Sequence, residues 1–212
     1  KDAWDTPVLV AVEGGTQELV VDTKDGLRAF DPRNGQSLWH CPGSKPPRYI
    51  CPSPVSNNGI VYALHGYFGP FTAIRAGGRG NAGTSHQVWQ LTDKRLGSNV
   101  PSPVWYAGNI YWTKSERGNV FCIDAETGEL QYRSQLTPRP HRIYASPLVA
   151  DGKLYYVSRK QGTYVLAAKP TFELLAHNTI ATDSSAFNAS PAVTEGRLLL
   201  RSDRFLYCIG MK

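Results

Sequence analysis

The residue types that most often carry chemistry are sparse in this sequence and are not spaced for catalysis. The five histidines, His40, His65, His86, His141 and His177, include no H-x-x-x-H pair, and no two cysteines form a C-x-x-C pair. The usual spacings of zinc ligands are therefore absent. The sequence also lacks the G-x-S-x-G motif of serine hydrolases. We predict neither catalytic residues nor a metal site.

A glycine-rich segment, Gly78–Ser85, imitates a phosphate-binding loop. It lacks the lysine that reaches the phosphates in such loops, and the apolar run that follows it favours a strand rather than a helix. We interpret the segment as a long hairpin loop.

The four cysteines have two interpretations. Cys122 and Cys208 fall at the same position of a repeated strand pattern, which predicts small buried hydrophobic side chains far from each other. Cys41 and Cys51 flank a proline-containing loop. Disulfide geometry is strict, so both a surface disulfide and two free thiols stay open for this second pair.

The elements that position these residues follow an internal repeat. A short segment centred on proline recurs at intervals of 47, 49, 44 and 44 residues. In four of the copies a glycine follows five residues later, in a turn such as Asn58-Gly59 or Asp151-Gly152, and such pairs favour the positive φ angles of tight hairpins. The five prolines are Pro7, Pro54, Pro103, Pro147 and Pro191.

Each repeat contains up to four short runs of β-branched and aromatic residues. Four strands in about 45 residues are typical of a propeller blade. We therefore predict an all-β chain, a partial β-propeller ring of about five four-stranded blades, in which the last blade lacks its fourth strand. The predicted blades span residues 4–40, 49–90, 98–135, 143–177 and 187–212.

Two copies of a turn motif lie between the third and fourth strands. The first contains Asp31, Gly35 and Trp39, and the second contains Asp124, Gly128 and Tyr132 in the same register. The aspartate accepts hydrogen bonds from backbone N–H groups within the turn, and the glycine supplies a positive φ. The aromatic side chain is predicted to pack between blades. Trp89 is predicted to occupy the aromatic position of the second blade.

This pattern resembles the tryptophan-docking motif of quinoprotein-type, PQQ-binding-like β-propeller repeat proteins. The whole chain resembles the C-terminal half of uncharacterised bacterial members, through segments such as Gly97–Pro103 and Leu200–Arg204, and it is similar in architecture to the propeller lipoproteins of outer-membrane assembly. The second and fourth blades depart from the motif. Residues 76–85 replace the turn in the second, and Ala168 and Ala176 replace the aspartate and the aromatic residue in the fourth.

Composition excludes several classes of function. Charged residues make up 19% of the chain and hydrophobic residues 41%, which predicts a packed core. The net charge is +6, but the basic residues are dispersed, so we predict no nucleic-acid partner. No apolar run reaches the roughly 18 residues of a membrane span. The resemblance implies a periplasmic or otherwise extracytoplasmic location, although the chain carries no signal peptide.

Loops at one end of the blades hold the candidate binding residues, because rigid propellers contact ligands through such loops. Their basic and aromatic side chains suit an acidic or peptide-like partner. The sequence therefore predicts a non-catalytic binding or scaffold module for a protein or peptide, with no cofactor, and a partial ring that is prone to self-association. The candidates are Tyr49, Asn99, Arg142, Tyr144 and Asn188 in loops that lead into first strands, and Arg159 and Arg201 in loops between second and third strands.

The alternative is a fragment of a PQQ- and Ca²⁺-dependent alcohol or sugar dehydrogenase. The resemblance implies that such enzymes hold the cofactor on the propeller axis, against a tryptophan and an adjacent pair of cysteines. No two cysteines are adjacent in this chain, which argues against this activity. PQQ and Ca²⁺ are expected only under this alternative.

Overall fold

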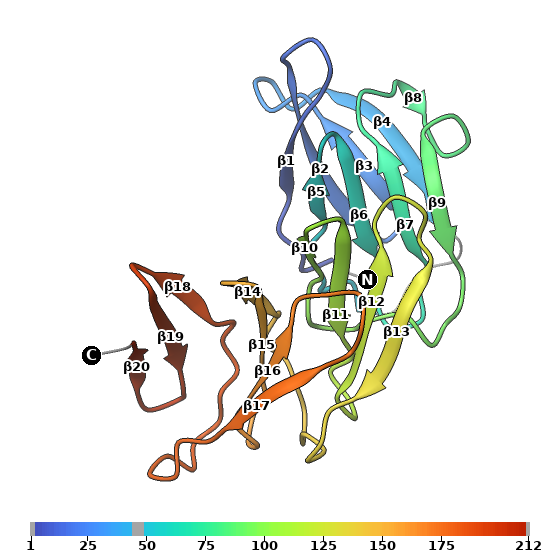
Figure 1. Cartoon of the computed structure of the whole chain (residues 1–212). Helices are drawn as coiled ribbons and strands as arrows, with labels where there is room; N and C mark the ends of the chain where they lie inside the picture. The colour runs from blue at the N-terminus through green and yellow to red at the C-terminus, as the bar shows by residue number, and fades with distance from the viewer. Residues whose placement is uncertain (1–2, 44–48, 211–212) are drawn as a thin grey trace.

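The protein folds into five β-sheets that follow one another along the chain (Figure 1). The computed structural model describes residues 3–43 and 49–210. The first sheet contains β1 (Val8–Ala11), β2 (Gln17–Thr23), β3 (Gly26–Phe30), β4 (Ser37–Pro42) and a short β8 (Gly80–Asn81). The second contains β5 (Val55–Asn57), β6 (Ile60–Leu64), β7 (Phe71–Arg75) and β9 (Gln87–Leu91).

The remaining sheets repeat this order. The third contains β10 (Val104–Tyr106), β11 (Asn109–Thr113), β12 (Asn119–Asp124) and β13 (Leu130–Gln135). The fourth contains β14 (Leu148–Ala150), β15 (Lys153–Val157), β16 (Thr163–Ala167) and β17 (Leu174–Asn178). The fifth has three strands, β18 (Ala192–Thr194), β19 (Arg197–Arg201) and β20 (Leu206–Ile209). The predicted fold class, an all-β partial propeller, is confirmed.

Local turn chemistry explains the repeated hairpins. In the second sheet Asn57 pairs with Ile60, so that Asn58 and Gly59 alone form the turn, with φ angles of 47° and 74°. Two consecutive positive φ angles define the type I′ turn, whose twist matches that of the strands it joins. The third, fourth and fifth sheets begin with the same two-residue turn.

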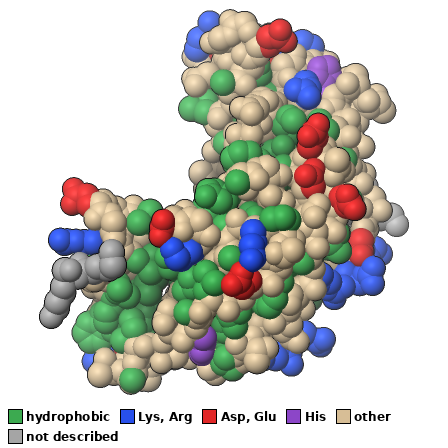
Figure 2. All heavy atoms as spheres, viewed as in Figure 1, with side chains coloured by type: hydrophobic (Ala, Val, Ile, Leu, Met, Phe, Trp, Pro, Cys, Tyr) green, Lys and Arg blue, Asp and Glu red, His purple; other side chains and the backbone are tan. Residues whose placement is uncertain are grey.

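The sheets pack face to face in an open arc (Figure 1). Three large clusters of buried side chains lie between successive pairs of the first four sheets. The cluster between the fourth and fifth sheets is smaller, with Ala145, Val157, Phe187 and Leu200 at its centre. The fifth sheet therefore has one covered face and one open face, and Figure 2 shows hydrophobic side chains gathered over it.

A series of hydrogen bonds from backbone N–H groups to serine hydroxyls joins the segments that lead into the first strands of successive sheets. The backbone N–H of Thr6 donates to Ser53 Oγ at 2.8 Å, and the N–H of Ser53 donates to Ser102 Oγ at 2.9 Å. The same bond links Ser102 to Ser146 at 3.0 Å and Ser146 to Ser190 at 2.9 Å. The hydroxyl residue before each recurring proline thus serves as a connection between neighbouring sheets.

Two features differ from the sequence predictions. The segment predicted as a long hairpin loop contains β8, which pairs in parallel with β4, so that the first sheet has five strands rather than four. Cys208 was predicted to be buried, but it is exposed, whereas Cys122 is buried. Cys208 lies on the open face of the fifth sheet, which no described residue covers. Cys41 and Cys51 are free thiols, which settles the choice that the sequence left open.

Candidate functional site

One end of the arc gathers most of the predicted binding residues. We call it the connector face, because it carries the connections between sheets and the loops that join second to third strands. There Arg142 Nη1 donates to the hydroxyl of Tyr144 at 2.9 Å. The Arg159 guanidinium lies over the Tyr144 ring, 4.9 Å from its centroid, and Arg159 Nε donates to Asn188 Oδ1 at 2.6 Å. Four predicted residues from two connections and one loop are thus in contact.

The contacts continue beyond these four residues in both directions. The hydroxyl of Tyr67 lies 3.4 Å from Glu116 Oε2, and Glu116 forms a β-bridge with Arg142. At the other end Asn188 Nδ2 donates to Asp203 Oδ1 at 3.3 Å. The resulting polar row crosses four sheets and consists of Tyr67, Glu116, Arg142, Tyr144, Arg159, Asn188 and Asp203.

Backbone hydrogen bonds hold the polar row in place. The N–H of Arg159 donates to the carbonyl of Arg142 at 2.8 Å, and the carbonyl of Arg159 accepts from the N–H of Phe187 at 3.0 Å. The loop of the fourth sheet is therefore bonded to its own connection and to the next one. Such bonding keeps the side chains of the row at fixed positions, as a binding platform requires.

The other three predicted residues lie apart from these four. Asn99 accepts a hydrogen bond from Ser115 Oγ at 2.5 Å, next to Glu116, so it flanks the polar row. Arg201 is exposed and shares a small cavity of about 260 Å³ with Asn188 and Asp203. Tyr49 packs against a residue outside the row. It stacks with Trp4, with ring centroids 6.5 Å apart.

Exposed aromatic side chains accompany the polar row. The exposed fractions of Trp4, Tyr49 and Phe68 are 60%, 62% and 52%. Tyr49 lies in a connection between sheets and Phe68 in a loop between second and third strands, so the propeller topology places them at the connector face, and Trp4, which precedes β1, donates its backbone N–H to the carbonyl of Ile50 next to Tyr49. Exposed aromatic side chains beside charged ones are typical of protein-binding surfaces.

The predicted docking residues occupy three different arrangements. Trp89 Nε1 donates to the carbonyl of Ala125 at 3.0 Å, and the Trp89 ring lies directly over Gly128 in the Asp124 turn of the next sheet. Tyr132 instead packs edge-on against Phe172, at 5.8 Å between centroids.

Trp39 is buried between the first and second sheets, where its Nε1 donates to the buried carboxylate of Glu18 at 2.6 Å. In the turn that begins at Asp31 the N–H of Gly35 donates to the carbonyl of Asp31 at 2.8 Å, as the N–H of Gly128 donates to that of Asp124 at 2.9 Å, and Gly35 has a φ of 73°. No described atom approaches within 4 Å of a Cβ built on Gly35.

A buried pair between the first two sheets escaped the sequence analysis. His65 Nδ1 lies 2.7 Å from Asp22 Oδ1, and both side chains are almost completely buried. The N–H of Asp22 donates to Asp5, whose pKa is raised by burial. The two partners are separated by 43 residues, so no local spacing could reveal them.

The described residues contain no group of three or more His, Cys, Asp and Glu side chains that could hold a metal ion. Residues 3–43 and 49–210 also contain no helix long and apolar enough to cross a membrane.

Comparison with known proteins places this geometry in a family. A family model described as outer membrane protein assembly factor BamB matches residues 78–200, which is more than half of the chain. The chain belongs to this family. No curated protein sequence matches the chain.

Solved structures similar to this BamB-family chain share its fold at low sequence identity. BamB from Moraxella catarrhalis is 14% identical, with a TM-score of 0.63 over 97% of this chain and 59% of that protein. Quinohemoprotein alcohol dehydrogenase from Comamonas testosteroni is 13% identical, with a TM-score of 0.67 over 99% of this chain and 41% of the enzyme. The designed protein Ika4 is 12% identical, with a TM-score of 0.58 over 83% and 99%. This chain therefore spans about three fifths of the Moraxella protein.

Proposed function

We propose that the protein is a non-catalytic binding module that holds a protein partner on its connector face. The observation that carries this proposal is the polar row, whose side chains cross four sheets and are fixed by backbone hydrogen bonds. The BamB family description supports a role in assembly rather than in catalysis. The same resemblance supports an extracytoplasmic location.

The chemistry of the connector face suits an extended peptide segment with acidic side chains. Arg142 and Arg201 are exposed and Arg159 is partly buried, and arginine binds carboxylates through paired N–H donors. Tyr49 and Phe68 add apolar area that a partner can cover. Glu116 and Asp203 make the surface mixed in charge, which favours one orientation of the partner over others.

Site-specific photo-crosslinking tests this proposal. Tyr49 and Phe68 are each replaced by p-benzoylphenylalanine in the protein produced in its native host, and the crosslinked species are identified by mass spectrometry. The matched control is the same replacement at Leu175, which is 46% exposed on β17, away from the connector face. We expect one partner protein to crosslink at Tyr49 and Phe68 and not at Leu175.

A second variant ties the partner to the polar row. Arg159→Gln removes the charge and the cation–π contact with Tyr144. In this variant the yield of the crosslinks at Tyr49 and Phe68 should fall several-fold. Equal crosslinking at all three positions would contradict a specific surface. Dye-linked alcohol or sugar oxidation after titration with PQQ and Ca²⁺ would contradict a non-catalytic role and favour the dehydrogenase alternative.

A further inference from the structure

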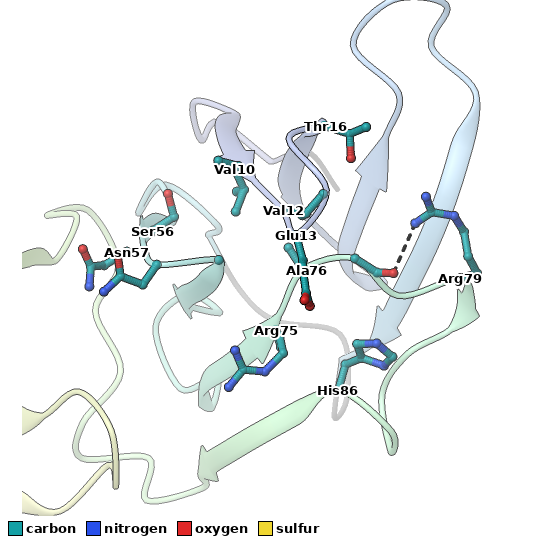
Figure 3. Close-up of a pocket in the computed structure, with 14 residues that line it drawn as sticks. Val10, Val12, Glu13, Thr16, Ser56, Asn57, Arg75, Ala76, Arg79 and His86 are labelled. Atoms are coloured by element: carbon teal, nitrogen blue, oxygen red, sulfur yellow. Dashed lines mark hydrogen bonds between the residues drawn. The ribbon is translucent and has the colours of Figure 1, made fainter.

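A cavity of about 720 Å³ opens at the opposite end of the first two sheets, which we call the turn face (Figure 3). It lies between the β1–β2 hairpin, the β5–β6 hairpin and the connection from β7 to β9. Its size falls in the range of small-molecule sites, roughly 300–1,000 Å³. Three segments far apart in the chain form the cavity, so no local sequence pattern predicts it.

The connection from β7 to β9 builds one wall of the cavity, and a buried carboxylate fixes that wall. Glu18 is 1% exposed and accepts three hydrogen bonds, from Trp39 Nε1, from the N–H of Gly77 at 3.0 Å and from Arg79 Nη1 at 2.9 Å. Arg79 Nη1 also donates to the carbonyl of Gly78 at 2.6 Å. The pairing of β8 with β4 holds the far end of the same connection. This segment stands where the first and third blades have the docking turn.

The ionisable side chains that line the cavity are mainly basic. Arg75, Arg79 and His86 line the cavity, with Glu13 as the one acidic lining residue. The carboxylate of Glu18 already accepts hydrogen bonds from three donors, and Arg79 is the one charged donor among them. Its negative charge therefore offsets the charge of Arg79 alone. Arg75 is exposed and takes part in none of the ion pairs of the described residues. The His86 ring is held by Ser85 Oγ, 2.8 Å from Nδ1.

The rest of the lining offers neutral hydrogen-bonding groups and an apolar surface. Ser56, Asn57 and Thr16 line the space, and Figure 3 shows them around it together with Val10 and Val12. A ligand with an anionic group and a short apolar part would place its charge at Arg75 and His86 and its carbon chain against the valines. Arginine and histidine donors beside a small apolar surface are typical of sites for such ligands.

We propose that this cavity is a second binding site, independent of the connector face, that takes a small anionic ligand bearing a carboxylate or a phosphate group. Arg75 would recognise a carboxylate and a phosphate through the same chemistry. The site lies on the opposite face from the polar row, so its occupation does not compete with a partner held there.

NMR titration tests the proposal with two anionic probes and one neutral probe. Succinate, inorganic phosphate and glycerol are each added to the ¹⁵N-labelled chain at constant ionic strength, and shifts are followed for the backbone of residues 75–79 and the His86 ring. We expect saturable shifts at these residues with succinate or phosphate and none with glycerol. Saturation with succinate alone indicates a carboxylate site, and saturation with phosphate alone indicates a phosphate site.

Substitutions separate this site from general surface charge. Arg75→Gln should weaken binding of the anion about 10-fold or more, because it removes a charged donor. Arg197→Gln is the matched control, since Arg197 is an exposed arginine on the fifth sheet, and it should leave the affinity unchanged. Arg75→Lys keeps the charge and should retain part of the affinity. Linear, unsaturable shifts up to about 50 mM, or equal binding by the Arg75→Gln variant, would overturn the proposal.

Discussion

Alanine variants of Gly35 and Gly128 isolate the free energy of aromatic docking between blades. The two glycines hold the same position in two copies of one turn, with φ angles of 73° and 76°. Alanine at either position must therefore adopt the same left-handed backbone conformation, at a cost of roughly 1–2 kcal/mol. This backbone cost is common to both variants and cancels in their difference.

The two positions differ in what an added Cβ would meet. At Gly128 it would lie 2.9 Å from Cδ2 and 3.1 Å from Cγ of Trp89, which real Cβ atoms do not tolerate. At Gly35 nothing lies within 4 Å. Overpacking of a buried contact costs roughly 1–3 kcal/mol. We therefore expect Gly35→Ala to lower the free energy of unfolding by about 1–2 kcal/mol, and Gly128→Ala to lower it by about 2–5 kcal/mol.

Urea denaturation of both variants, followed by far-UV circular dichroism, measures the two losses. In a chain of this size each 1 kcal/mol shifts the melting temperature by roughly 2–4 °C, so thermal melting gives a second measure. The emission of Trp89 should also shift to the red in Gly128→Ala and stay unchanged in Gly35→Ala. Losses equal within about 0.5 kcal/mol would refute the assignment of Gly128 as the seat of Trp89.

Three further predictions concern Trp39, the thiols of Cys122 and Cys208, and the turn at Asp124. Trp39→Ala should lower the free energy of unfolding by roughly 3–5 kcal/mol in urea denaturation, because it empties a buried aromatic position, and a loss below about 1 kcal/mol would contradict the docking role. Cys208 should react with iodoacetamide in the native state and Cys122 should not, because Cys208 is exposed whereas burial raises the pKa of the Cys122 thiol to about 12. The backbone N–H of Thr127 lowers the pKa of Asp124 below its usual 3.8, so this stabilising contribution is complete above about pH 4 and is lost as the pH falls through the lower folded value. The urea midpoint should therefore drop on acidification, and this drop should be smaller in Asp124→Asn, whereas equal pH profiles would contradict it.

Local chemistry made the fold predictable from the sequence. Each tight hairpin depends on two adjacent residues, such as Asp151 and Gly152, and each repeated turn on a short motif such as that from Asp124 to Gly128. These features act within a few residues of the chain and recur at a fixed interval. The repeat also predicted that Arg142, Tyr144, Arg159 and Asn188 share one end of the arc, although it could not predict their mutual contacts.

Features that depend on which sheets meet could not be predicted in this way. The pair of His65 and Asp22 and the cavity at Arg75 arise where two sheets face each other, and no local pattern encodes them. The exposure of Cys208 shows the same limit. Its sequence position matches that of Cys122, but burial depends on whether another sheet covers the face on which the residue lies.

Between neighbouring sheets of this fold, one face of a sheet packs against the opposite face of the next. The outer face of the first sheet and the outer face of the fifth sheet correspond to these two kinds of face. In the first sheet Leu9, Leu19 and Phe30 occupy one row across β1, β2 and β3. The equivalent row of the third sheet contains Ile110 and Ile123, which are fully buried against the second sheet. In the first sheet nothing described covers this row, and Leu9 is 52% exposed.

The opposite side of that interface is exposed on the fifth sheet, where Leu206 is 69% exposed beside Cys208. These two faces correspond to the two faces that pack together between neighbouring sheets. We therefore predict that the 212-residue chain associates head to tail through them. Such a contact joins different surfaces and need not close, so sedimentation velocity should show a mass that grows with concentration. Leu9→Glu or Leu206→Glu should each suppress this growth, whereas Leu175→Glu, the same change at an exposed leucine of β17, should not. A single monomeric species over a hundredfold range of concentration would show that the exposed faces do not bind each other.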